Sequence, residues 1–173
     1  MTELLLLLWN VRSGLQMVAF AVLVVLALRF GAGPERAVAF IIGQMPVTDA
    51  LYHAIFQSTA RLYEVELGHL MIDLVTAIAL IFIAQQANRM YTLWIGSFQL
   101  VALQAHLIRE LVSEVSPIAY FTMQTLPSYF QILVLAIGLF LHHRRQLQYG
   151  RYRDWRNFSC LSSLIARQNL RAA

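Results

Sequence analysis

Four apolar segments, each long enough to cross the hydrocarbon core of a bilayer, constrain this chain more than any other feature. They cover residues 14–30, 65–84, 90–112 and 117–141. A helix rising about 1.5 Å per residue needs roughly 20 residues to cross about 30 Å of hydrocarbon. The composition agrees, because 59% of the residues are hydrophobic and only 13% are charged, too few to cover a soluble domain. We therefore predict an all-α integral membrane protein with four transmembrane helices.

The chain between the first two apolar segments, residues 31–64, is more polar. Its first part is too short to cross a membrane and ends at Pro46, after which a new amphipathic helix is expected. No helix breaker follows, so a single helix over residues 48–88 remains possible. We place residues 31–64 outside the membrane as a re-entrant or amphipathic segment. Residues 1–141 then form a four-helix membrane domain, followed by a basic, partly amphipathic cytoplasmic tail, residues 142–173.

The placement of arginine predicts the orientation in the membrane. All 13 basic residues are arginine, a bias that we attribute to a GC-rich bacterial genome. With both termini in the cytoplasm, Arg89 and the tail arginines lie on the inner side, as the positive-inside rule requires. We therefore predict a multi-pass protein of a bacterial inner membrane with the orientation N-in/C-in.

The tail interleaves arginine with aromatic residues. Trp155 and Phe158 share one face of a helix that would begin at Asp154. Such a helix, lying next to the last span, favours contact with anionic lipid at the cytoplasmic face rather than with nucleic acid. The residues expected to make this contact are Arg144, Arg145, Arg151, Arg153 and Arg156.

The second and third spans carry ionisable side chains where charge is costly. Glu66, His69 and Asp73 fall on one helical face, and a second polar stripe follows one side of the third span. The short connection between these spans makes them an antiparallel hairpin, so the two stripes meet at one depth in the outer half of the bundle. The fourth span adds Gln124. We call this set the predicted cluster: Glu66, His69, Asp73, Gln99, His106, Arg109, Glu110 and Gln124.

The predicted cluster has three interpretations, which the sequence leaves open. The first is a buried network that docks the helices, with Arg109 as the counter-ion. The second is a metal site or, with His69 or His106 as the ligand, a haem site. Its metal ligands would be Glu66, His69, His106 and Asp73, with Glu110 as a further candidate. Arg109 weakens this interpretation because a guanidinium repels a cation. The third is an oligomeric proton- or ion-coupled transporter or channel.

Motifs that would indicate an enzyme are missing from the sequence. It contains no His-Glu-x-x-His, Gly-x-Ser-x-Gly or phosphate-loop pattern. The single cysteine, Cys160, excludes an intrachain disulfide and a multi-cysteine metal site. We therefore expect a small non-enzymatic membrane protein, in the role of an accessory or structural subunit. Its expected partners are the lipid bilayer and either other membrane subunits or further copies of itself, and a metal ion or haem is the alternative to having no cofactor.

Overall fold

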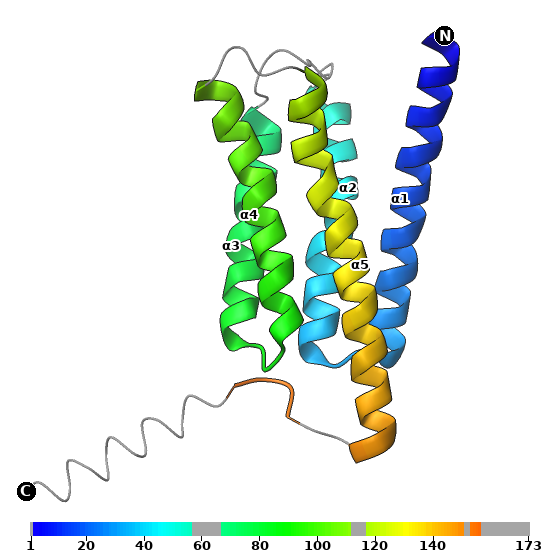
Figure 1. Cartoon of the computed structure of the whole chain (residues 1–173), viewed down its shortest axis with the longest axis vertical. Helices are drawn as coiled ribbons and strands as arrows, with labels where there is room; N and C mark the ends of the chain where they lie inside the picture. Colours follow the sequence, from blue (N-terminus) through cyan, green and yellow to red (C-terminus); the bar gives the residue numbers. More distant parts are fainter. Residues whose placement is uncertain (1, 57–66, 112–116, 151–152, 157–173) are drawn as a thin grey trace, which may run out of the picture.

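The computed structural model of the chain describes residues 2–56, 67–111, 117–150 and 153–156. Within these ranges it contains five α-helices. They are α1 (Thr2–Phe30), α2 (Gly33–Phe56), α3 (Leu67–Gln86), α4 (Met90–Leu111) and α5 (Pro117–Tyr149). The helices lie side by side in one bundle, and helices that follow one another in the chain run in opposite directions (Figure 1). The predicted all-α fold is confirmed.

Three of the described helices are long and apolar enough to cross a membrane: Gly33–Ile55, Gly68–Gln86 and Thr125–Tyr149. Two of these overlap predicted spans, whereas the first lies in the segment that we expected outside the membrane. The predicted span 14–30 forms a shorter apolar helix, Gly14–Phe30. The predicted span 90–112 forms α4, whose buried Gln99 and His106 reduce its apolar character.

α2 corrects the prediction for residues 31–64. The helix continues through Pro46, where we expected a short helix to end. A proline inside a helix removes one backbone hydrogen bond. Tertiary contacts nevertheless hold both halves of α2: before Pro46, Val38 and Ile42 pack in the bundle core, and after it the ring of Tyr52 lies against Gly68 of α3. Glu35, near the start of α2, forms an ion pair with Arg89. Placing the segment that contains Glu35 outside the membrane and Arg89 inside is therefore wrong.

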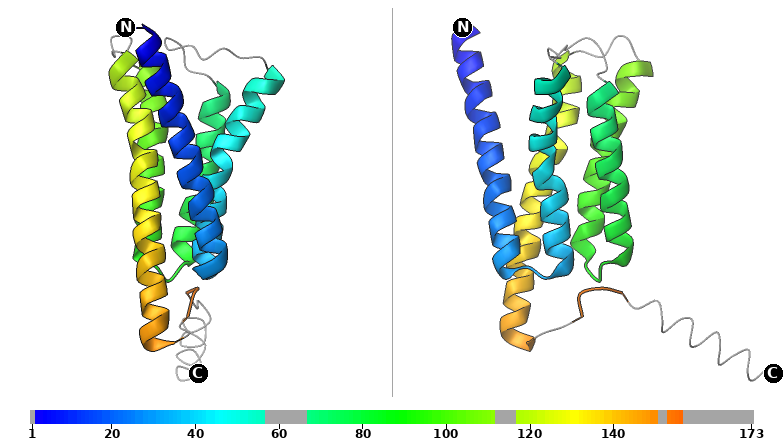
Figure 2. Two further views of the ribbon diagram at one scale, coloured as in Figure 1. Left: turned by 90° about the vertical axis from the view of Figure 1, so that its right-hand side faces the viewer. Right: turned by 180° about the vertical axis from the view of Figure 1, so that it is seen from behind.

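The two ends of the bundle are built differently, and we name each after one residue. At the Arg89 end, α1 and α5 finish, α2 begins and the α3–α4 turn lies (Figure 1). At the His69 end, α1 and α3 begin and α2 finishes. The second half of α2 leans away from α5 toward the His69 end (Figure 2). The start of α1 and the end of α5 thus lie at opposite ends of the bundle.

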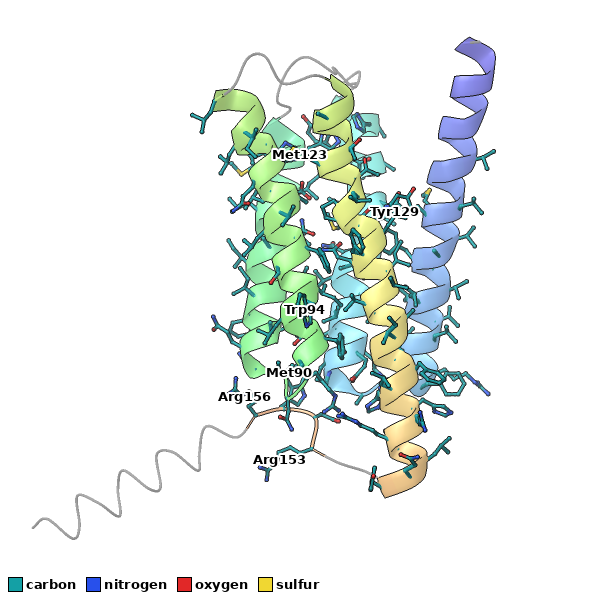
Figure 3. The ribbon with its side chains drawn as sticks, in the orientation of Figure 1. Met90, Trp94, Met123, Tyr129, Arg153 and Arg156 are labelled. Carbon is teal, nitrogen blue, oxygen red and sulfur yellow. The ribbon has the colours of Figure 1, made fainter. Side chains whose placement is uncertain are left out.

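Apolar side chains fill the bundle near the Arg89 end and also cover its outside. The core includes Phe20, Leu23, Val38, Ile42, Leu80, Ile95 and Leu135. Large apolar side chains are exposed on the outer face of each described helix: Val22, Phe40, Phe82, Trp94 and Phe140 are examples. Trp94 of α4 and Tyr129 of α5 are labelled in Figure 3. An outer surface of this kind is suited to lipid rather than to water.

A short extended segment crosses the Arg89 end after α5. The helix continues past the predicted end of the last span to Tyr149, and Gly150, with a φ of 72°, terminates it. Residues 153–156 then run beneath the α3–α4 turn (Figure 3). The amide of Asn88 donates to the carbonyl of Asp154 at 3.1 Å, and the amide of Arg156 donates to that of Gln86 at 2.8 Å. A helix beginning at Asp154 is therefore wrong for these residues, and Phe158 lies outside the described residues.

Candidate functional site

A cavity of about 410 Å³, with both apolar and polar side chains in its wall, lies between the helices toward the His69 end. Each of the five described helices contributes to its wall. The polar side chains that line it include Gln16, Asp49, His69, Asp73, Gln99, Ser128 and Gln131. Gln16 of α1 donates to the hydroxyl of Ser128 of α5 at 2.8 Å, which closes one side of the cavity. A cavity of this size with a few converging polar groups is a typical small-ligand or ion site.

Asp73 is the centre of a buried hydrogen-bond network on one wall of this cavity. Nε2 of Gln99 donates to one carboxylate oxygen of Asp73 at 3.0 Å, and Nε2 of His106 lies 3.0 Å from the other. Gln131 donates in turn to the side-chain oxygen of Gln99 at 2.9 Å and to the carbonyl of Ile95 at 3.3 Å. These side chains are almost fully buried. α3, α4 and α5 are therefore linked by a network whose members satisfy one another.

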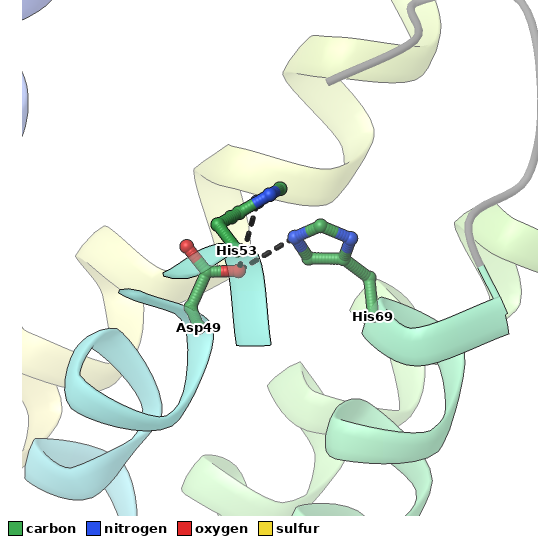
Figure 4. A group of neighbouring side chains, drawn as sticks. All are labelled: Asp49, His53 and His69. Carbon is green, nitrogen blue, oxygen red and sulfur yellow. Dashed lines mark ion pairs between the residues drawn. The ribbon is translucent and has the colours of Figure 1, made fainter. Parts of the chain in front are cut away.

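Asp49, His53 and His69 form a second group (Figure 4), of which Asp49 and His69 line the cavity. Asp49 and His53 lie one turn apart on α2, and His69 faces them from the first turn of α3. Nε2 of His69 lies 2.5 Å from Oδ1 of Asp49, and Nε2 of His53 lies 3.8 Å from the same oxygen. All three side chains are partly exposed. Within the described parts of the chain, this is the group whose ligand atoms converge closely enough for one metal ion.

Close packing between α2 and α3 positions this group. The ring of Tyr52 lies against Gly68, where a β-carbon would overlap it. The same ring makes edge contacts with His53 and His69, with ring centroids 5.6 Å and 5.7 Å away. A glycine at position 68 thus lets α2 approach the first turn of α3. This approach sets the distance between Asp49 and His69.

The structure divides the predicted cluster into separate groups. It brings Asp73, Gln99 and His106 together, but it directs His69 toward Asp49 of α2 instead. The predicted metal set of Glu66, His69, His106 and Asp73 therefore does not converge among its described members. The Nε2 atoms of His69 and His106 both face carboxylates, and a haem ligated by either histidine stays a prediction.

The remaining members of the predicted cluster cannot be placed in the site. Glu66 lies outside the described residues. The backbones of Arg109 and Glu110 belong to α4 and that of Gln124 belongs to α5, but their side chains lie outside the described part of the structure. The counter-ion role predicted for Arg109 therefore remains a prediction.

Sequence reasoning missed Asp49 and His53 as site residues. We expected the preceding helix to end at Pro46, so Asp49 fell at the start of a new helix. The signal was nevertheless present: an aspartate and a histidine four residues apart lie on one face of a continuous helix and can act on the same ligand. This spacing points to a site in the bundle only when α2 continues as one helix through Pro46.

A different group of charged side chains lies at the Arg89 end, where each nitrogen of the Arg89 guanidinium has a hydrogen-bond partner. Nε of Arg89 donates to Oε1 of Glu35 at 3.0 Å, and Nη2 donates to Oδ1 of Asp154 at 3.0 Å. Nη1 of Arg89 donates to the carbonyls of Asn88 and Arg153. His142 of α5 is buried at this end, with Nδ1 3.6 Å from Oε1 of Glu35. This guanidinium therefore binds α2, the α3–α4 turn and the tail together.

Comparisons with protein-family models, with curated proteins and with solved structures found no match. The function is therefore argued from the site itself. The relevant features are the cavity, its two carboxylates at Asp49 and Asp73, and the imidazoles of His53, His69 and His106 that lie beside them.

Proposed function

We propose that this chain is a non-enzymatic integral membrane protein that binds a cation in the cavity at the His69 end. The observation that carries this proposal is the charge of the cavity wall. Asp49 and Asp73 both line it, whereas no arginine side chain among the described residues does. Carboxylates in a protein-lined, low-dielectric site require a compensating positive charge. A bound cation supplies that charge directly.

The proposed membrane domain contains five helices rather than the four that the sequence predicts. Three described helices meet the length and apolarity required for a span. α1 and α4 lie alongside them in the same bundle and expose apolar side chains such as Val25 and Trp94 on their outer faces. Thr92, Gln99 and His106 of α4 face the interior. A helix with such a polar stripe is stable in a bilayer when the stripe faces protein.

We propose that the Arg89 end faces the cytoplasm of a bacterial inner membrane. The arginines described at that end are Arg29, Arg36, Arg89, Arg144, Arg145, Arg153 and Arg156. The positive-inside rule places such an end in the cytoplasm. The end of α5 is then inside, as predicted, but the start of α1 is outside. Arg144 and Arg145 are exposed on the last turns of α5, where they are suited to contact anionic lipid.

Cation binding is tested by the thermal unfolding of the full chain in lipid nanodiscs. Na⁺, K⁺, Mg²⁺, Ca²⁺, Mn²⁺ and Zn²⁺ are added separately. A bound cation at about 100 times its Kd stabilises the folded state by about 2.7 kcal/mol, so at least one of them should raise the unfolding temperature. The double variant Asp49→Asn, Asp73→Asn should lose this response, and Asp154→Asn at the opposite end should keep it. The proposal fails if no cation stabilises the protein or if the double variant responds like the original chain.

The orientation is tested by labelling single cysteines in intact cells with a membrane-impermeant maleimide. Cys160 is the only native cysteine and should stay unlabelled until the membrane is opened. The variant Thr2→Cys, Cys160→Ser should be labelled from outside. Labelling of Cys160 in intact cells would reverse the proposed orientation, and protection of both sites would restore the N-in/C-in prediction.

A further inference from the structure

We infer that Asp49, His53 and His69 form a binding site for one divalent transition-metal ion beside the cavity. This inference rests on the proposed cation binding and names the chemical class of the cation. It also assigns the ligands, which come from α2 and α3 rather than from the predicted set on the second and third spans.

The ligand atoms are already as close together as a small metal ion requires. One nitrogen from each histidine and one carboxylate oxygen all lie within 4.8 Å of one another. Ligands about 2.1 Å from a tetrahedral Zn²⁺ are roughly 3.4 Å apart. The two distances to Oδ1 of Asp49, 2.5 Å from His69 and 3.8 Å from His53, lie on either side of that value. Small rotations of the side chains would admit an ion without moving either helix.

The close ion pair between His69 and Oδ1 of Asp49 does not account for the position of His53. Nε2 of His53 lies 3.8 Å from the same oxygen, which is too long for a hydrogen bond. Two imidazole nitrogens therefore face one carboxylate oxygen, as they would around a shared cation (Figure 4).

The donor atoms select the class of ion. Two imidazole nitrogens and one carboxylate suit Zn²⁺, Mn²⁺, Fe²⁺ and related ions. Mg²⁺ and Ca²⁺ prefer shells made of oxygen, so they should bind weakly here. Three protein ligands also leave at least one coordination position open. Because Asp49 and His69 both line the cavity, an open position beside them is accessible to water or to a small ligand within it.

The second carboxylate of the cavity is a poorer metal ligand. Both oxygens of Asp73 are already engaged, one by Gln99 and the other by His106. Coordination there would require a fully buried network to break. Asp73 thus contributes negative charge to the cavity, whereas Oδ1 of Asp49 faces two imidazole nitrogens.

The test is a competition titration of the full chain in nanodiscs, with a chelating dye that reports free Zn²⁺ or Mn²⁺. Mg²⁺ is titrated in parallel by isothermal calorimetry. The variants are Asp49→Asn, His53→Gln, His69→Gln and Asp73→Asn, and the matched control is His143→Gln, an exposed histidine at the Arg89 end. Circular dichroism without metal identifies any variant that fails to fold. His53→Gln, on the partly exposed side of the group, keeps the test decisive if His69→Gln does not fold.

The inference predicts one Zn²⁺ or Mn²⁺ per chain, bound about 100-fold or more weakly after loss of any of the three ligands. Asp73→Asn should weaken binding less than tenfold, and His143→Gln should leave it unchanged. The inference is overturned, while cation binding stands, if only Mg²⁺ or alkali ions bind. It is also overturned if Zn²⁺ binding depends on Asp73 but on neither His53 nor His69. If no cation binds at all, both proposals fail.

Discussion

The two ends of the bundle differ in the groups that surround their carboxylates. At the Arg89 end, the buried carboxylate of Glu35 is paired with a guanidinium that also holds Asp154. At the His69 end, Asp49 and Asp73 line a cavity where histidines and glutamines, but no described arginine, surround them. A carboxylate with a permanent counter-ion stabilises the fold. Asp49, which faces two imidazoles beside the cavity, is available for a cation, whereas both oxygens of Asp73 are engaged by Gln99 and His106.

This contrast explains why only one end is proposed as a site. Arg89 donates from Nε, Nη1 and Nη2 to partners on α2, the α3–α4 turn and the tail segment. A guanidinium cannot lose its charge in a protein, so a metal ion would be repelled at this end. The Asp49 group carries no such fixed positive charge among its described neighbours.

Arg89→Leu should cause the largest loss of stability. It would leave the buried carboxylate of Glu35 without its guanidinium, and the loss of one partner from a buried ion pair costs about 3–5 kcal/mol. The free energy of unfolding can be measured by SDS titration in mixed micelles. The control Arg36→Leu removes an exposed arginine at the same end and should change stability by less than about 0.5 kcal/mol. Equal effects of the two variants would show that Arg89 is not a structural counter-ion.

Gln131→Leu should have an intermediate effect at the other end. It would remove the donor to the side-chain oxygen of Gln99 and to the carbonyl of Ile95. A buried acceptor left unsatisfied costs about 1–3 kcal/mol. The same SDS titration measures it, with the exposed Gln148→Leu as the control. If Gln131→Leu and the control have the same free energy of unfolding, the hydrogen bonds of Gln131 do not hold α5 against α4.

Gly33→Ala should have the smallest effect, confined to the tail segment. A β-carbon at this position would lie 2.7 Å from Nε1 of Trp155, and the partly exposed indole can move away. We expect a local cost of about 1 kcal/mol, equivalent to roughly fivefold faster amide exchange at Asn88 and Arg156. Hydrogen-exchange mass spectrometry measures this, with Gly14→Ala as the control because nothing lies within 4 Å of its β-carbon. Unchanged exchange would show that Trp155 does not hold the segment in place.

The fold class could be predicted from the sequence because apolar length and helical periodicity are local properties. The antiparallel hairpin of α3 and α4 followed from their short connection, and with it the proximity of Asp73 to Gln99 and His106. α2 could not be predicted in the same way. Pro46 is a helix breaker on local grounds, whereas the contacts that hold α2 on either side of it, Ile42 in the bundle core and Tyr52 against Gly68, are long-range.

The error in α2 led to the other errors in the site. With α2 outside the bundle, neither Glu35 nor Asp49 could be assigned a partner inside it. The charges themselves were visible in the sequence, but which ones meet is a long-range property of the fold. Arg89 and Glu35, for example, are brought together by the packing of α2 and α3. Their pairing has no signature in either local segment.

The most direct test of the contrast between the two ends is X-ray absorption spectroscopy at the zinc edge. The full chain in nanodiscs is loaded with one equivalent of Zn²⁺ and compared with the His69→Gln variant. The account predicts nitrogen and oxygen ligands at about 2.0–2.1 Å, with the multiple-scattering signal of two imidazoles in the original chain and of fewer in the variant. A first shell made only of oxygen, or an imidazole signal that does not depend on His69, would contradict it.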